Sequence, residues 1–224
     1  MVEHQLRARG IRDERVLAAM AELPREIFLP LELEEDAYDD TALPIAAGQT
    51  ISQPFIVALM TELLEPNPGM RVLEVGTGSG YQAAVLGRLG CDVLSIERQP
   101  ELAAAARARL ASLGLADRVR IEVADGSVGW RLGAPFEGIL VTAAAPRVPD
   151  PLRRQLADGG RLVIPVGPLS GQELLQVIRR REGFEERTFG GCVFVPLVGA
   201  AAYDEETVIR ARRRWLGSWR GQRP

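Results

Sequence analysis

Three glycines stand at alternating positions directly after an apolar run in the first half of the chain. The run covers residues 71–75, and Gly76, Gly78 and Gly80 follow it. A buried strand that stops at glycines lets a bulky ligand approach its backbone closely. The next apolar run ends at Glu97, and a carboxylate there can accept hydrogen bonds from the two hydroxyls of a ribose. These two features predict a site for an adenosyl ligand.

Each of these features also has a purely structural interpretation. Glycines end strands for turn geometry alone, and Glu97 can cap a helix that begins near Pro100. Asp125 and Gly126, which follow the next apolar run, can form an ordinary turn. We favour a ligand site because acidic residues follow both of the runs that come after the glycine loop. A dinucleotide site is a competitor, but its GxGxxG pattern places the third glycine one residue later than here.

The residue types that are absent restrict the chemistry. The chain contains no lysine, and its single histidine, His4, lies in a polar segment. Schiff-base catalysis, histidine-based catalysis and a phosphate-binding loop with its lysine are therefore disfavoured. Cys91 and Cys192 stand alone in apolar surroundings, which indicates two buried thiols, a reducing cytoplasm and no metal site. We also expect no export signal and no membrane span.

Short apolar runs alternate with helical patterns after a turn signal at residues 67–69. The runs cover residues 71–75, 91–96, 119–123, 138–141 and 161–166. Helical spacing at residues 81–89 and 101–113 separates the first three runs. Such alternation predicts an α/β fold with a doubly wound, Rossmann-like and mostly parallel sheet. The ligand crevice of such a sheet lies at the carboxyl ends of its strands, where the glycine loop is expected.

The last third of the chain predicts a different arrangement. Residues 174–178 and 193–197 have strand-like patterns with no convincing helix between them, so we expect an antiparallel pair at the sheet edge. The whole chain is expected to form one domain. It comprises a helical N-terminal cap at residues 1–66, the α/β core with its edge strands at 67–199, and a basic C-terminal tail at 200–224.

Arginines and two tryptophans gather at the C-terminus. Six arginines between residues 210 and 223 flank Trp215 and Trp219, a pattern that also occurs in tails that bind nucleic acid. The tail is short and the whole chain has a net charge of -3, so we interpret the tail as a partly docked, solvated terminal helix. No nucleic acid and no membrane are expected as partners.

Residues 48–58, with the sequence GQTISQPFIVA, resemble the signature that precedes the cofactor motif in protein-L-isoaspartate O-methyltransferases. Further matches to that family occur in the same order along most of the chain. They cover residues 3–6, 11–13, 24–30, 78–84, 141–146, 159–167 and 194–197. Two positions depart from the family pattern, because Val198 stands where threonine is common and Ala46 where glycine is frequent. The missing hydroxyl at Val198 leaves one hydrogen bond to cofactor or substrate in question.

The resemblance implies methyl transfer from S-adenosylmethionine to the free α-carboxylate of L-isoaspartyl residues in damaged proteins and peptides, with S-adenosylhomocysteine as product. The methyl ester then closes to a succinimide without the enzyme. A carboxylate is already ionised at neutral pH, so the reaction needs no histidine or lysine base. The protein must instead align the carboxylate oxygen, the methyl carbon and the sulfur, and must strip water from the nucleophile.

The resemblance also implies which residues form the site. Ser52 is placed at the substrate carboxylate, although by itself it also suits the N-cap of an apolar helix running to Leu64. The expected cofactor contacts are Glu74, Gly76, Thr77, Gly78, Ser79, Glu97, Arg98, Asp125 and Gly126. The expected lining of the acceptor side is Thr50, Ile51, Gln53, Thr142, Ala143, Ala144 and Val195.

Within the cofactor set, Glu97 is assigned to the ribose, and Asp125 with Gly126 to the adenine. Glu74 either orients the glycine loop or simply ends a strand. Isoaspartyl proteins and peptides are the expected partners of a cytoplasmic monomer, held as extended chains by backbone bonds near residues 193–197. Two alternatives stay open: a methyltransferase of the same fold for another carboxylate, and a non-catalytic module that binds cofactor or RNA.

Overall fold

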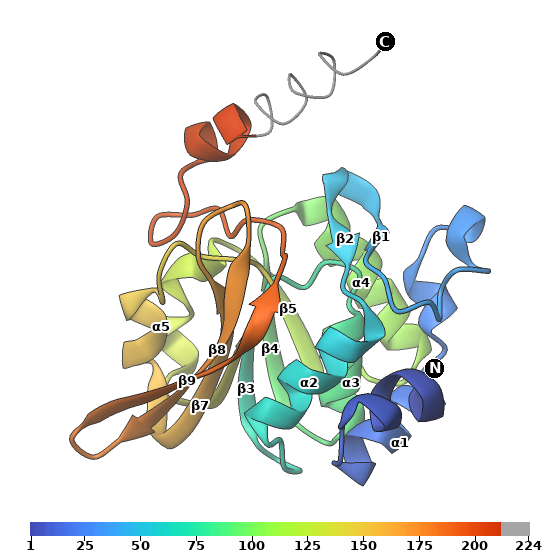
Figure 1. Ribbon diagram of the computed structural model, residues 1–224, viewed down its shortest axis with the longest axis horizontal. Helices are drawn as coiled ribbons and strands as arrows, with labels where there is room; N and C mark the ends of the chain where they lie inside the picture. Colours follow the sequence, from blue (N-terminus) through green and yellow to red (C-terminus); the bar gives the residue numbers. More distant parts are fainter. Residues whose placement is uncertain (212–224) are drawn as a thin grey trace.

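A seven-stranded sheet forms the centre of the computed structural model, which describes residues 1–211 (Figure 1). Its strands follow one another in space as β5-β4-β3-β6-β7-β8-β9. The strands are β3 (Arg71–Val75), β4 (Asp92–Glu97), β5 (Val119–Val123), β6 (Phe136–Val141), β7 (Leu156–Val166), β8 (Gln172–Arg180) and β9 (Gly183–Cys192). The five strands β3 to β7 are parallel. β8 pairs antiparallel with both β7 and β9. The predicted parallel sheet with an antiparallel edge is confirmed.

The order of the strands reverses at β3. The chain proceeds outward from β3 to β4 and β5, and then returns to place β6 on the other side of β3. Val72 of β3 is accordingly paired with Val93 of β4 on one side and with Gly138 of β6 on the other. In an open parallel sheet, ligands bind in the crevice outside the carboxyl ends of the strands at such a switch point. The glycine loop leaves β3 at this place.

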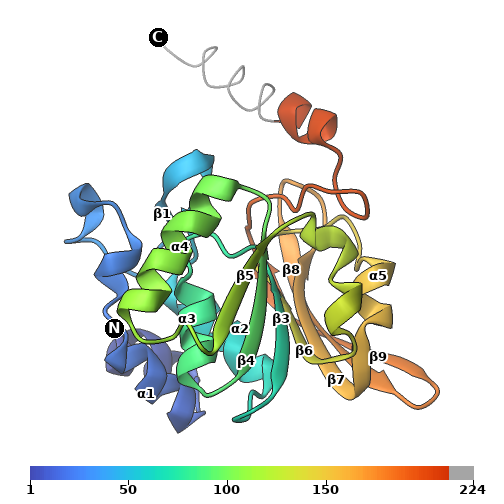
Figure 2. The same cartoon turned by 180° about the vertical axis from the view of Figure 1, so that it is seen from behind.

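Helices cover both faces of the sheet, as a doubly wound fold requires (Figures 1 and 2). The helices are α1 (Glu14–Glu22), α2 (Pro54–Leu64), α3 (Tyr81–Arg88), α4 (Pro100–Ser112) and α5 (Asp150–Arg154). β3 divides its buried side chains between the two faces, because successive residues of a strand point to opposite sides. Val72 packs in the core with residues of α1 to α4, whereas Leu73 and Val75 pack with Leu152 of α5.

Short segments connect these elements. A two-stranded ribbon, β1 (Leu43–Pro44) with β2 (Thr50–Ile51), lies at the end of the sheet where the segment after β9 also passes (Figure 1). Val2–Leu6 forms a π-helical turn. The 3-10 turns are Arg7–Arg9, Arg25–Phe28, Leu31–Leu33, Ala46–Gly48, Gly126–Val128 and Arg131–Gly133.

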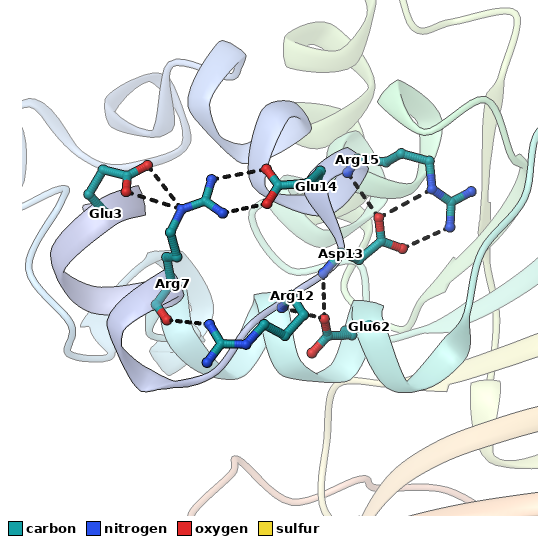
Figure 3. Close-up of polar contacts among 7 residues, drawn as sticks. All are labelled: Glu3, Arg7, Arg12, Asp13, Glu14, Arg15 and Glu62. Atoms are coloured by element: carbon teal, nitrogen blue, oxygen red, sulfur yellow. Dashed lines mark hydrogen bonds and ion pairs between the residues drawn. The ribbon is translucent and has the colours of Figure 1, made fainter.

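Polar contacts fasten the N-terminal segment to α2 (Figure 3). The Asp13 side chain caps α1 by accepting a hydrogen bond from the Arg15 amide at 2.9 Å. The Glu62 carboxylate of α2 accepts hydrogen bonds from the backbone amides of Arg12 and Asp13, at 2.7 and 2.6 Å. The N-terminal segment therefore fixes the carboxyl half of α2, while the other end of this helix begins just after Ser52.

The edge of the sheet differs from the prediction. β8 pairs with β9 (Gly183–Cys192), whereas residues 193–197 form no strand of the main sheet. β9 is exposed on both faces and rich in charged residues, so it lacks an apolar signal. Residues 194–197 are apolar because they pack at the carboxyl end of the sheet, where the Leu197 amide donates to the Ala144 carbonyl at 2.7 Å. The predicted solvated helix of the arginine-rich tail lies, beyond residue 211, outside the described residues.

Candidate active site

The loop after β3 is shaped by its glycines. Gly76, Gly78 and Gly80 all have positive φ angles, of 97°, 53° and 92°, a conformation that other residues rarely adopt. A Cβ atom on Gly76 would lie 2.4 Å from Oγ1 of Thr142, so no side chain fits there. The Thr142 hydroxyl in turn donates to the Val75 carbonyl at 3.1 Å. The loop and the end of β6 therefore form one compact wall.

A cavity opens beside this wall. Its lining comes from the ends of β3, β4 and β6, from β2, and from the segment after β9. The predicted site residues that line it are Thr50, Ile51, Ser52, Gly76, Thr77, Gly78, Ser79, Glu97, Arg98, Gly126, Thr142, Ala143 and Val195. Segments that lie far apart in the sequence are thus brought to one crevice.

Glu97 is the buried carboxylate of this cavity, with 6% of its surface exposed. Its Oε2 accepts a hydrogen bond from the Gly78 amide at 2.9 Å, and its Oε1 accepts one from the Gln99 amide at 2.9 Å. It is not the N-cap of α4, because Gln99 holds that position. An ionised carboxylate offers about four acceptor sites, so Glu97 keeps capacity for the hydroxyls of a ribose.

Glu74 lies behind the loop rather than in the cavity. Its side chain is fully buried, and the Ser95 hydroxyl donates to its Oε2. The same Ser95 hydroxyl lies 2.5 Å from Oγ1 of Thr77, so a chain of polar contacts joins Glu74 to the glycine loop. Burial raises the pKa of Glu74 to about 8, despite the hydrogen bond from Ser95. Glu74 is therefore mostly protonated at neutral pH. It is linked to the glycine loop through the Ser95 hydroxyl.

Asp125 also lies outside the cavity, although its neighbour Gly126 lines it. The Asp125 carboxylate accepts hydrogen bonds from the Ser127 hydroxyl at 2.7 Å and from the Ala200 amide at 2.8 Å. Desolvation acts to raise the pKa of Asp125, but the hydrogen bonds from Ala200 and Ser127 lower it below its usual value. The backbone at Gly199 lies so close to Asp125 that a Cβ on Gly199 would be 2.1 Å from Oδ1 of Asp125.

These contacts hold a strap, residues 195–203, against the cavity. The Ala201 amide donates to the Ser127 hydroxyl at 3.0 Å, and the Tyr203 hydroxyl donates to the Gly167 carbonyl at 2.5 Å. Val198, within the strap, lines the cavity with its apolar side chain. The sequence reasoning missed the strap, because the pattern of residues 199–203 carries no signal except Gly199 itself.

Ser52 stands between this cavity and a second one. The second cavity runs along the start of α2, the end of β9 and residues 193–195. Four residues line both cavities: Thr50, Ser52, Thr142 and Val195. Gln53 lines only the second cavity, and Ala144 lines neither but donates from its amide to the Val195 carbonyl at 2.8 Å.

The N-cap interpretation of Ser52 does not hold. The N-cap of α2 is Gln53, which makes no side-chain capping bond. The Phe55 amide in the first turn instead donates to Oδ1 of Asp40 at 2.9 Å. Ser52 is fixed through its backbone, because its carbonyl accepts a hydrogen bond from Nη2 of Arg25 at 2.8 Å. Its hydroxyl is not committed to capping.

Two kinds of feature are absent from residues 1–211. No group of three or more histidine, cysteine, aspartate or glutamate side chains within this range is arranged to hold a metal ion. No helix in the same range is long and apolar enough to cross a membrane.

Comparison with known proteins identifies close relatives. The profile of the family described as Protein-L-isoaspartate(D-aspartate) O-methyltransferase matches residues 1–202. The protein-L-isoaspartate O-methyltransferase of Methylorubrum populi is 60% identical over 205 residues, which cover 90% of this chain and 96% of that protein. The enzyme of the same name from Methanoregula boonei is 54% identical over 204 residues, which cover 91% of this chain and 94% of that protein.

Solved structures named for the same family have a similar fold. One structure named protein-L-isoaspartate O-methyltransferase has a TM-score of 0.79 at 29% identity, and the match covers 95% of this chain and 70% of that chain. A structure from Plasmodium falciparum, described as a putative protein-L-isoaspartate O-methyltransferase in complex with S-adenosyl-L-homocysteine, has a TM-score of 0.75 at 26% identity. That match covers 88% of this chain and 96% of the other.

Proposed function

Because the chain belongs to the protein-L-isoaspartate O-methyltransferase family, we propose that its two adjoining cavities hold the methyl donor and the isoaspartyl acceptor, with Ser52 at their junction. The protein is a repair methyltransferase that uses S-adenosylmethionine. The observation that carries the proposal is the wall shared by the two cavities, since donor and acceptor must meet for transfer to occur.

The first cavity suits the methyl donor. Glu97 accepts from the ribose hydroxyls, and Gly78, where a Cβ would meet only Cδ1 of Ile45 at 3.8 Å, allows the ligand to approach the loop backbone. Gly76 lines the same cavity and lets Thr142 pack against the loop. Gly126 contacts the adenine end, while Asp125 acts indirectly by holding the strap. The bound cofactor supplies a methyl group made electrophilic by its sulfonium sulfur. The fit is supported by the spare acceptor capacity of the buried Glu97 carboxylate in the cavity wall.

The second cavity suits the acceptor. An α-carboxylate is ionised at neutral pH, so the site needs no general base. The Ser52 hydroxyl donates a hydrogen bond to one carboxylate oxygen and leaves the other free to attack. Thr142 and Val195, which line both cavities, shape the passage and exclude water from it. Positioning and desolvation therefore supply most of the catalysis.

An extended peptide fits along the end of β9 and the residues that follow it. Gly190 and Gly191 line this cavity without side chains, and Val193 is 78% exposed. Backbone contacts of this kind accept many sequences, as an enzyme that repairs damage must. A fixed-sequence peptide that bound far more tightly than isoaspartyl peptides of scrambled sequence would contradict this mode of binding.

We further propose that the enzyme acts in the cytoplasm as a monomer, on damaged proteins rather than on nucleic acid or membranes. The two free cysteines, Cys91 and Cys192, suit a reducing compartment.

The test uses methyl-labelled S-adenosylmethionine and two peptides that differ only in L-isoaspartyl or L-aspartyl linkage. We expect base-labile methyl ester on the isoaspartyl peptide alone. Ser52→Ala should lower kcat/KM for that peptide by about 10- to 100-fold, the worth of a hydrogen bond to a charged group, while binding of S-adenosylhomocysteine is unchanged. Ser112→Ala, an exposed serine on α4, is the matched control.

Three outcomes would contradict the proposal. Equal methylation of both peptides would indicate another kind of carboxylate acceptor. Absence of ester on either peptide, with the cofactor still bound, would point to a different substrate or a binding role. Unchanged kcat/KM in Ser52→Ala would remove Ser52 from the acceptor site.

A further inference from the structure

A fully buried arginine lies directly behind Ser52. Arg25, in the 3-10 turn Arg25–Phe28, has 0% of its surface exposed. Its Nη2 donates to the Ser52 carbonyl at 2.8 Å, and its Nε donates to the Ala37 carbonyl at 2.7 Å. Its Cζ lies 4.7 Å from the centre of the Tyr81 ring, and Tyr81 lines the donor cavity. One guanidinium thus contacts residues of both cavities.

The charge of Arg25 is not neutralised by the groups it contacts. Its hydrogen bonds end on two carbonyl oxygens, and its Nη1 is buried with no hydrogen-bond partner among residues 1–211. Taking a cation out of water is costly unless a counter-charge and hydrogen bonds compensate it. Carbonyl oxygens and an aromatic face supply part of this compensation. Within residues 1–211, no carboxylate forms an ion pair with the Arg25 guanidinium.

Asp40, the acidic side chain whose charge acts on Arg25, is engaged elsewhere. Asp40 forms an ion pair with Arg9, and Oδ1 of Asp40 accepts a hydrogen bond from the Phe55 amide at 2.9 Å. Gln53 also donates to Oδ2 of Asp40, at 3.4 Å. Glu26, in the same turn as Arg25, is also engaged, because its carboxylate accepts a hydrogen bond from the Tyr38 hydroxyl. Neither carboxylate is hydrogen-bonded to the Arg25 guanidinium. The amino end of α2, with its partial positive charge, begins just after Ser52.

We propose that Arg25 is a positioning residue for the acceptor carboxylate: it fixes Ser52 through the carbonyl of that residue and supplies a buried positive charge that the incoming carboxylate neutralises. The proposal rests on the assignment of Ser52 to the acceptor under the proposed function. It extends that assignment, because the site then selects for the charge of the acceptor and not only for its shape.

The chemistry of the guanidinium suits both tasks. Its planar fork reaches two carbonyl groups at once and stacks on an aromatic ring, which a lysine ammonium cannot do in the same geometry. It also stays charged when desolvated, because its ordinary pKa is far above neutral. A neutral residue of similar size preserves packing and removes the charge, so the two contributions can be separated.

The experiment compares two ligands on protein saturated with S-adenosylhomocysteine. One is an isoaspartyl peptide with its free α-carboxylate, and the other is the same peptide with an α-carboxamide. Calorimetry gives both dissociation constants for the wild type, Arg25→Gln, Arg25→Met and Arg25→Lys. Arg107→Gln is the matched control, because Arg107 also donates to a backbone carbonyl, that of Ile121 at 2.7 Å, but lies on α4 away from the site.

The wild type and Arg107→Gln should prefer the carboxylate. In Arg25→Gln and Arg25→Met this preference should fall by about tenfold, as expected for unit charges several Å apart in a partly desolvated site. Arg25→Lys should restore most of it. Arg25→Met provides a second neutral variant if the glutamine variant does not fold, because it removes a buried charge that has no ionic partner and retains an apolar stem.

Equal weakening of both peptides in the neutral variants would show a purely structural role and overturn the proposal. The same holds if every neutral variant keeps the wild-type preference. A wild type that binds the carboxylate and the carboxamide equally well would instead contradict the acceptor assignment of Ser52 itself. These outcomes distinguish a structural role of Arg25 from a wrong assignment of Ser52 to the acceptor.

Discussion

The Glu97 carboxylate and the Gly78 amide are joined by a hydrogen bond of 2.9 Å that ties the end of β4 to the glycine loop of β3. The other oxygen of Glu97 accepts from the Gln99 amide. Glu97 therefore holds the loop in shape before any ligand arrives, and it presents its remaining lone pairs to the cavity. Preorganisation of this kind reduces the cost of binding.

Glu97→Gln is expected to weaken the binding of S-adenosylmethionine and S-adenosylhomocysteine by about 10- to 100-fold, because hydrogen bonds to a charged acceptor contribute roughly 1.5–3 kcal/mol. The loss should appear in the dissociation constant measured by calorimetry. KM for the isoaspartyl peptide, measured at saturating cofactor, should change little, since Glu97 does not line the acceptor cavity.

Glu182→Gln is the control for this substitution, because Glu182 is exposed in the turn between β8 and β9. It should leave cofactor binding as in the wild type. Wild-type affinity in Glu97→Gln would show that the ribose is bound elsewhere.

The strap is expected to retain the cofactor through Asp125. Asp125→Ala removes the acceptor of the Ala200 amide and should raise the dissociation constant of S-adenosylhomocysteine about five- to tenfold, mainly through faster release. Gly199→Ala should have a similar or larger effect, since its Cβ would lie 2.1 Å from Oδ1 of Asp125. Stopped-flow measurement of product release checks both.

The two substitutions should not be additive, because both act on the same contact. In the Asp125→Ala background, Gly199→Ala is expected to cost less than it does alone. Gly171→Ala is the control, since a Cβ at Gly171 would meet nothing within 4 Å. Strict additivity would show that Asp125 and the strap influence the cofactor independently.

Much of the core could be predicted because buried parallel strands and their glycine turns leave strong local signals. Residues 71–75 and 119–123 were predicted as strands and are β3 and β5 with the same bounds. The predicted sheet class and the crevice beside the glycine loop followed from alternation alone. Ser52, in contrast, was assigned to the acceptor by family resemblance, since its local sequence alone favours an N-cap.

The remainder depends on contacts between residues far apart in the sequence. Asp125 has the local pattern of a turn or a ligand contact, and only the fold brings Ala200 to its carboxylate. The sequence around Arg25, an arginine after a proline, is typical of a surface position. The fold buries its side chain behind Ser52. β9 was not predicted, because an edge strand that is exposed on both faces has no apolar pattern in its sequence.

Glu74 predicts a pH dependence of stability. Burial raises its pKa from 4.5 to about 8 in the folded protein. Between these values the folded state keeps a proton that the unfolded state releases, so the stability of the wild type falls as pH rises. The limiting slope is about 1.4 kcal/mol per pH unit for one proton. Below pH 4.5 the residue is protonated in both states and contributes no slope.

Glu74→Gln mimics the protonated form and removes this contribution. Its free energy of unfolding, relative to the wild type, should increase steadily as pH rises from about 5 to about 8. Denaturant titrations at several pH values check the difference, with Glu182→Gln again as control. A constant difference across this window would mean that Glu74 is ionised in the folded protein.

Cys192 offers a direct test of the two cavities, because it lines the acceptor cavity and not the donor cavity. Partial burial raises the pKa of its thiol to about 11, so alkylation by iodoacetamide should be slow at pH 7 and faster at pH 9. An isoaspartyl peptide should protect Cys192 when S-adenosylhomocysteine is bound, whereas S-adenosylhomocysteine alone should not. Cys91, which is buried, should remain unmodified throughout and serves as the internal control in mass spectrometry. Protection by S-adenosylhomocysteine alone, or equal protection by the L-aspartyl peptide, would show that the second cavity is not the acceptor site.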